Sequence, residues 1–126
     1  MTNQLDAEHL LSLIGQSTAR HTRVRDSSVL YAAAARPDST ILKIPTFETT
    51  AERAAAILHS VIRWEPLDMW NMSFGWSAAR SLAGVNGSDL VMPPFDRMTL
   101  VDEILDNRVD AVAEIAERIA PFLRDK

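Results

Sequence analysis

The sequence contains no cysteine, which excludes disulfide bonds and metal sites built from thiolates. Its uninterrupted apolar runs are short, and none approaches the roughly 20 residues that a membrane-spanning helix needs. Glycine occurs only 4 times. No glycine-rich phosphate-binding loop and no Ser-His-Asp arrangement is visible. We therefore expect no membrane partner and none of these common catalytic or binding motifs.

Positive charge is also sparse. Lys and Arg number 13 against 17 Asp and Glu, for a net charge of −4. The basic residues are scattered, apart from the small group His21, Arg23 and Arg25. Binding to nucleic acid depends largely on neutralising phosphates, so this balance argues against nucleic acid as the main partner. The acidic first residues lack the basic and apolar regions of a signal peptide, so we expect a cytoplasmic location.

Length and composition predict one ordinary globular domain. The 126 residues suit a single unit over residues 1–126. A 47% share of hydrophobic and 24% of charged residues is typical of such a domain. The histidines, His9, His21 and His59, do not have the spacing of metal ligands, so no metal site is predicted.

Helical patterns cover most of the chain. Apolar spacing and cap residues predict six helices. Their predicted extents are Asp6 to Gly15, a segment capped at Asp26, Ser27 or Ser28 and ending at Arg36, Ala51 to Arg63, Ser73 to about Val85, Leu100 (capped by Thr99) to about Asn107, and Asp110 to Leu123. Thr49 with Glu52 fits a capping box, and Asn86-Gly87 is a typical helix stop. The segment 91–97 is predicted to be a turn.

One segment, STILKIPTF (39–47), is predicted to be extended. Pro45 excludes a central strand, so we expect a short hairpin or flap. The fold prediction is therefore all-α: a compact bundle of five to seven helices with one short extended flap. For Ile41, Ile44 and Phe47, docking of a partner and covering of the core are equally open.

Several segments, in order, resemble the Doc (death-on-curing) branch of the Fic superfamily. They are DSSVLYAAAARPDSTI, TAERAAAILHSVIRWEP and LAGVNG, and DNRVDAVAEIAERIAPFL resembles a Doc C-terminus. The resemblance covers nearly the whole chain and implies a small helical Fic fold. Active members of that family transfer a nucleotide-derived group, usually AMP, to a protein hydroxyl. Doc toxins transfer phosphate to elongation factor Tu, and a partner antitoxin masks their groove with a helix.

The resemblance also implies where the active-site loop lies. Active Fic loops begin with a histidine and a phenylalanine, and continue with an acidic residue, a small residue, an asparagine and basic residues. The histidine is the general base, the acid holds a metal ion on the phosphates, and the arginine clamps phosphate oxygens. The matching segment here is RWEPLDMWNMS (63–73).

This segment lacks most of the family's chemistry. Glu65 stands at the histidine position, Met69 at the acidic position and Trp70 at the small position, while Asn71 matches. Neither residue after Asn71 is basic. A general base alone contributes about 10²–10⁴-fold in rate. We therefore expect a catalytically degenerate member that needs no cofactor. It would act by binding a protein, such as an antitoxin helix, another Fic protein or a translation component, in a bacterial toxin–antitoxin or phage-related module.

The alternative is a Fic-type enzyme with altered loop chemistry that transfers phosphate or AMP from ATP to a protein hydroxyl. Glu65 would act as the base, Asp68 would hold Mg²⁺, and Asn71 would orient phosphate. Trp64 and Trp70 would desolvate Glu65, which raises the pKa of a carboxyl group. An open, polar groove leading to Glu65 would favour this enzyme.

The bulky apolar residues of the loop also have two interpretations. The favoured one is an apolar plug of Trp64, Met69, Trp70 and Met72 that fills a former cleft. The other is an exposed patch that binds a partner, because Trp and Met are enriched at interface cores. Together with the flap, the candidate partner-binding residues are Ile41, Ile44, Phe47, Trp64 and Trp70.

For two further polar residues we favour structural roles over catalytic or binding roles. His59 is expected to make a structural hydrogen bond rather than to act in catalysis. Arg80 is expected to be solvated or ion-paired, although it could reach a groove.

Overall fold

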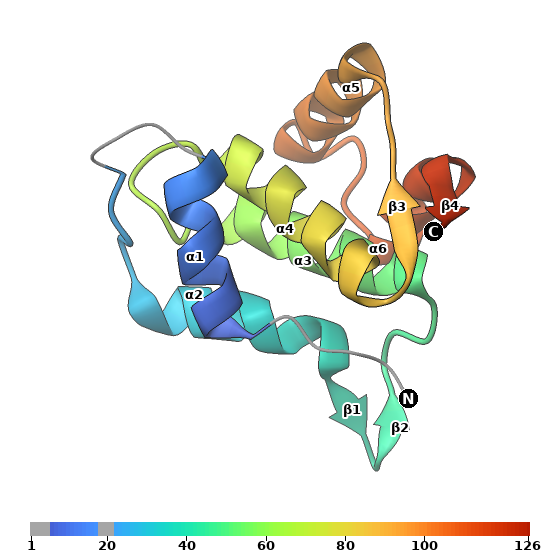
Figure 1. Ribbon diagram of the computed structural model, residues 1–126, viewed down its shortest axis with the longest axis horizontal. Coiled ribbons are helices and arrows are strands. Elements are labelled where there is room, and N and C mark those ends of the chain that lie inside the picture. The colour runs from blue at the N-terminus through green and yellow to red at the C-terminus, as the bar shows by residue number, and fades with distance from the viewer. Residues whose placement is uncertain (1–5, 18–21) are drawn as a thin grey trace.

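The computed structural model describes residues 6–17 and 22–126 (Figure 1). His21 lies outside these residues. Within them the chain forms six α-helices and two short 3₁₀ turns, so the all-α prediction is confirmed. The helices are α1 (Ala7–Ser17), α2 (Ser27–Ala35), α3 (Thr50–Trp64), α4 (Asn71–Val85), α5 (Pro94–Leu105) and α6 (Val112–Ile119), and the turns are η1 (Arg36–Asp38) and η2 (Ala120–Phe122).

Helix α3 is the centre of the bundle. It begins as predicted, because the Thr49 hydroxyl accepts a hydrogen bond from the Glu52 N–H at 3.1 Å. Most of its side chains are buried, including Ala54, Ala55, Ala56, Ile57, Leu58, Val61 and Ile62. Helix α4 packs closely against it at Gly75, where an added Cβ would lie 3.2 Å from the Val61 side chain. This packing fixes the end of α3 and the start of α4, between which the candidate site lies.

Two small antiparallel sheets accompany the helices. Strands β1 (Thr40–Ile41) and β2 (Ile44–Pro45) form the predicted flap, which projects from the bundle below the other elements in Figure 1. Strands β3 (Ser88–Leu90) and β4 (Leu123–Asp125) pair near the C-terminal end. This second sheet was not predicted, because three-residue strands are too short to show alternation.

The predicted start of the fifth helix is wrong. Helix α5 begins at Pro94 rather than at Leu100, so Thr99 is not its cap. Proline suits the first turn of a helix, where its missing N–H is not needed. Thr99 lies inside the helix and its hydroxyl donates to the Phe95 carbonyl at 2.9 Å. Of the predicted turn at 91–97, only residues 91–93 therefore lie outside the helix.

Other helix boundaries differ by smaller amounts. Helix α6 ends at Ile119 rather than at Leu123, because Pro121 cannot continue a helix, and η2 and β4 follow it. Helix α1 continues past Gly15 to Ser17, and α4 begins at Asn71, two residues before the predicted start. The predicted caps at Asp6 and Asp26 and the predicted stop at Asn86-Gly87 are confirmed.

Among the described residues, the longest helices, α3 and α4, have 15 residues each, and none has the length and apolar character to cross a membrane.

Candidate functional site

The candidate site is the loop between α3 and α4, residues 65–70. Its two ends are left-handed: Glu65 has φ 48° and ψ 65°, and Trp70 has φ 68° and ψ 22°. A left-handed conformation costs a residue other than glycine roughly 1–2 kcal/mol. Such conformations persist only where the surroundings hold them in place. The contacts around this loop do so from two sides.

Asn71, the first residue of α4, binds the loop backbone through its side chain. Its side-chain oxygen accepts a hydrogen bond from the Leu67 N–H, and its side-chain nitrogen donates to the Leu67 carbonyl, both at 3.0 Å. Leu67 itself is only 1% exposed and belongs to the core. The side chain of Asn71 is therefore engaged in holding the loop.

Arg25 holds the other end of the loop. Its Nη2 donates to the Trp64 carbonyl at 2.9 Å and to the Glu65 carbonyl at 2.6 Å, and its Nε donates to the Glu65 carbonyl at 2.9 Å. Carbonyls at the end of a helix lack partners within the helix and carry partial negative charge. Arg25 therefore caps the C-terminus of α3 with a cation.

The backbone just before α2 also binds the loop. Val24 forms an antiparallel bridge with Leu67, and the Arg25 N–H donates to the Pro66 carbonyl at 2.7 Å. Asp68 donates its N–H to the Arg23 carbonyl and accepts from the Arg23 N–H through Oδ1, both at 3.0 Å. The loop is thus tied along its length to a segment about 40 positions earlier in the chain.

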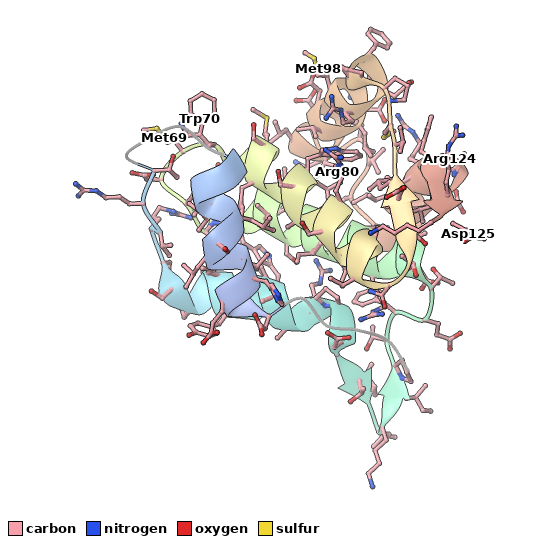
Figure 2. All side chains as sticks on the ribbon, viewed as in Figure 1. Met69, Trp70, Arg80, Met98, Arg124 and Asp125 are labelled. Atoms are coloured by element: carbon pink, nitrogen blue, oxygen red, sulfur yellow. The ribbon has the colours of Figure 1, made fainter. Side chains whose placement is uncertain are left out.

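Four large apolar side chains in this loop or directly beside it are exposed. Trp64 is 38% exposed, Trp70 is 48%, and Met69 and Met72 are 50% each. Figure 2 shows Met69 and Trp70 at the surface of the loop. The prediction of a buried plug is therefore wrong, because Leu67 fills the core beneath the loop. We call these four exposed residues the loop patch.

Two of the three residues proposed for an altered enzyme, Asp68 and Asn71, make hydrogen bonds to the backbone. Glu65 is exposed, so Trp64 and Trp70 do not desolvate it as predicted. One carboxylate oxygen of Asp68 and both polar atoms of the Asn71 amide bind backbone groups. Among the described residues, no group of three or more His, Asp or Glu is placed to hold a metal ion. At positions 65, 69, 72 and 73, where the family's histidine, acidic residue and basic residues would stand, the chain has Glu, Met, Met and Ser.

The flap presents aliphatic side chains to solvent. Ile41 is 67% exposed and Ile44 is 62% exposed, so neither covers the core. Leu42 at the tip is 90% exposed. Phe47, just after the flap, is half-buried, with the Arg36 guanidinium 5.8 Å from its ring centroid.

His59 makes the structural hydrogen bonds that were predicted. Its Nδ1 lies 2.8 Å from Arg36 Nη1, and its Nε2 lies 3.2 Å from Asp110 Oδ1. Burial lowers the pKa of His59 below its usual value near 6.5, and the hydrogen bond to Asp110 only partly offsets this.

Arg80 is exposed, as predicted, but it also lines a pocket. This pocket, of about 450 Å³, lies between α4 and α5 and is lined by Met72, Ser73, Trp76, Ser77, Arg80, Pro94, Arg97, Met98, Val101 and Asp102. Figure 2 shows Arg80 on the side of α4 that faces α5, and Met98 on α5. The Arg97 guanidinium lies 5.8 Å from the Trp76 ring centroid. The pocket therefore joins apolar walls to two cationic groups, Arg80 and Arg97, and one carboxylate, Asp102.

Three residues that contact the site were missed from the sequence: Arg25 and Arg36, which act through their side chains, and Arg23, which acts through its backbone. Arg23 and Arg25 were noted only as a small basic group. Their contacts with the loop join residues 39 to 45 positions apart. Local patterns carry no signal for such pairs.

One comparison with known proteins identifies the family. The chain is 30% identical to Toxin Doc of Mycolicibacterium smegmatis over 118 residues, which cover 94% of this chain and 84% of that protein. No family model matches the chain, and no solved structure matches it. At this identity and coverage, the chain belongs to the Doc branch of the Fic superfamily. It is therefore a Doc-like protein related to the toxins of toxin–antitoxin modules.

Proposed function

We propose that this Doc-like protein acts by binding another protein in a bacterial toxin–antitoxin or phage-related module, in the cytoplasm and without the family's transfer reaction. One observation carries the proposal. Hydrogen bonds from Asn71 and Arg25 anchor the loop backbone, and Trp70 and Met69 are exposed to solvent. Trp and Met are enriched at the cores of protein interfaces, and a surface that is already ordered loses little entropy on binding.

The proposed partner is an antitoxin-type helix, with a translation component as the second choice. Exposed aliphatic residues on the flap, Ile41 and Ile44, supply apolar contacts for one face of an amphipathic helix. The pocket between α4 and α5 has apolar walls beside Arg80 and Arg97. These features suit a partner that carries apolar side chains and carboxylates.

Co-purification with the product of the neighbouring gene tests the binding role. The tagged chain is expressed together with that gene product, and the recovered complex is quantified by size-exclusion chromatography. Trp70→Ser and Ile44→Ser are each expected to weaken the complex about tenfold or more. Tyr31→Ser is the matched control, because Tyr31 is 62% exposed on α2, outside both segments. Equal binding by all three variants would refute the proposal.

Incubation with labelled ATP and Mg²⁺ tests the loss of the transfer reaction. We expect no labelled protein in a lysate and no heat of nucleotide binding by calorimetry. Robust labelling that disappears in Glu65→Gln would instead establish the enzyme with altered chemistry, in which Glu65, Asp68 and Asn71 act.

A further inference from the structure

Arg36 lies close to two aromatic rings, one beside the flap and one beside the loop. Its guanidinium carbon is 5.8 Å from the centroid of the Phe47 ring, at the base of the flap. It is also 5.4 Å from the Trp64 ring, at the start of the loop. Both distances allow cation–π attraction. One side chain from η1 therefore contacts the residue that follows the flap and the residue that precedes the loop.

The same guanidinium is fixed by hydrogen bonds to α3. Arg36 Nη1 donates to Ser60 Oγ at 2.9 Å and lies 2.8 Å from His59 Nδ1, with a longer contact of 3.4 Å to the Ala56 carbonyl. A guanidinium can do both at once, because its donors lie in its plane and its two faces remain open to aromatic rings. A lysine ammonium lacks that geometry.

His59 must be neutral for this arrangement. An arginine N–H can only donate, so Nδ1 of His59 accepts and its proton is on Nε2, which donates to Asp110 Oδ1. The charged groups that face His59 are Arg36 from η1, Arg63 from α3 and Asp110 from the segment before α6. Protonating Nδ1 would oppose one donor to another at 2.8 Å and place two cations in contact.

We propose that Arg36 is a positioning residue that couples the order of the flap to that of the loop, and that protonation of His59 releases this coupling. The consequence for docking rests on the proposed function: a partner that contacts Ile44 or Trp70 meets a segment that Arg36 already helps to hold in place at neutral pH. The coupling itself is a property of the free chain and needs no partner.

Hydrogen exchange of the free protein, followed by mass spectrometry, tests the coupling. Trp64→Leu removes one ring and is expected to speed exchange about 3- to 10-fold in residues 40–47, as well as in the loop. Phe47→Leu removes the other ring and is expected to speed exchange in residues 65–70, as well as in the flap. Ile44→Ser is the control, because Ile44 is on the flap and is largely exposed. It should affect the flap alone.

Arg36→Lys keeps the charge and is expected to speed exchange in both segments. If that variant does not fold, the two ring variants decide the question. If Trp64→Leu speeds exchange only in the loop and Phe47→Leu only in the flap, the coupling between the two segments is refuted.

Acidification tests the role of His59. After correction for intrinsic exchange rates, protection of residues 40–47 is expected to fall between pH 7.5 and pH 5. His59→Asn keeps an acceptor near the Nδ1 position and cannot be protonated, so its flap should stay protected. Equal protection of the wild-type flap at both pH values would overturn the release step. These results do not depend on any partner, so they remain informative if the co-purification experiment fails.

Discussion

The Asn71 side chain binds both the N–H and the carbonyl of Leu67, with two hydrogen bonds of 3.0 Å. Asn71→Ala leaves those two half-buried backbone groups without their partner. We expect it to lower the free energy of unfolding by about 1–3 kcal/mol, as measured by urea denaturation. Ser73→Ala, two residues along the same helix and exposed, should change it by less than about 0.5 kcal/mol. Equal values for the two variants would show that Asn71 does not hold the loop.

Arg25 and Arg23 offer a matched pair around the same loop. Arg25 acts through its side chain, which donates to the Trp64 and Glu65 carbonyls, whereas Arg23 contacts Asp68 only through its backbone. Arg25→Ala is expected to lower the free energy of unfolding by about 1–2 kcal/mol, because it removes charge-assisted bonds at a helix C-terminus. Arg23→Ala removes the same charge and should leave the free energy of unfolding nearly unchanged. Urea denaturation measures both variants. A similar loss in both variants would attribute the effect to net charge rather than to capping.

The helical part of the fold was predictable because each helix carries local signals. Asp26 and Thr49 cap helices as their sequence positions indicate, and the apolar stretch of α3 marks it as central. Two predicted helix boundaries were wrong because proline can either begin a helix or end one. Pro94 begins α5 rather than preceding a later helix, and Pro121 ends α6. The periodic pattern alone does not distinguish these cases.

The site was predictable only as a location. The residue types in segment 63–73 indicate which family features are missing, but not which way Trp70 points. That direction depends on its left-handed backbone and on buried Leu67 beneath it. Leu67 in turn is held by Asn71 and by its bridge to Val24, neither of which a local pattern reveals. Arg36 was visible only as the residue before Pro37. Its position between Phe47 and Trp64 follows from the packing of three separate segments.

Breaking the ion pair between Arg53 and Asp38 is expected to destabilise the fold strongly. Arg53 Nη2 lies 2.5 Å from Asp38 Oδ1, and the two side chains are 2% and 19% exposed. Asp38→Asn takes the counter-charge away from a buried cation, which costs about 3 kcal/mol. The exposed pair of Arg108 and Asp106, 64% and 63% exposed, is the control. Asp106→Asn should cost less than about 0.5 kcal/mol. Urea denaturation distinguishes these values, and equal losses would contradict the expected effect of burial.

The tip of the flap carries backbone strain that a substitution can relieve. Leu42 has φ 51° and Lys43 has φ 69°, so both central residues of this two-residue turn are left-handed. Glycine adopts that conformation without the clash of a Cβ atom. Lys43→Gly is expected to raise the free energy of unfolding by about 0.5–1 kcal/mol. Lys43→Ala removes the same charge but keeps the strain, and it should give no increase. A gain of equal size in the alanine variant would assign the effect to charge.

His59 should make stability depend on pH in a defined direction. Burial lowers its pKa in the folded protein below the unfolded value near 6.5, so the unfolded chain binds the proton more readily. The stability that this histidine contributes is therefore fully present above about pH 6.5. It is lost as the pH falls from there to the lower folded pKa. Urea denaturation at pH 7.5 and at pH 5.5 should show the lower free energy of unfolding at pH 5.5. In His59→Asn this difference should shrink, because the variant has no group to protonate at that position. An unchanged difference would mean that other groups cause it, and that Arg36 is not held by a neutral His59.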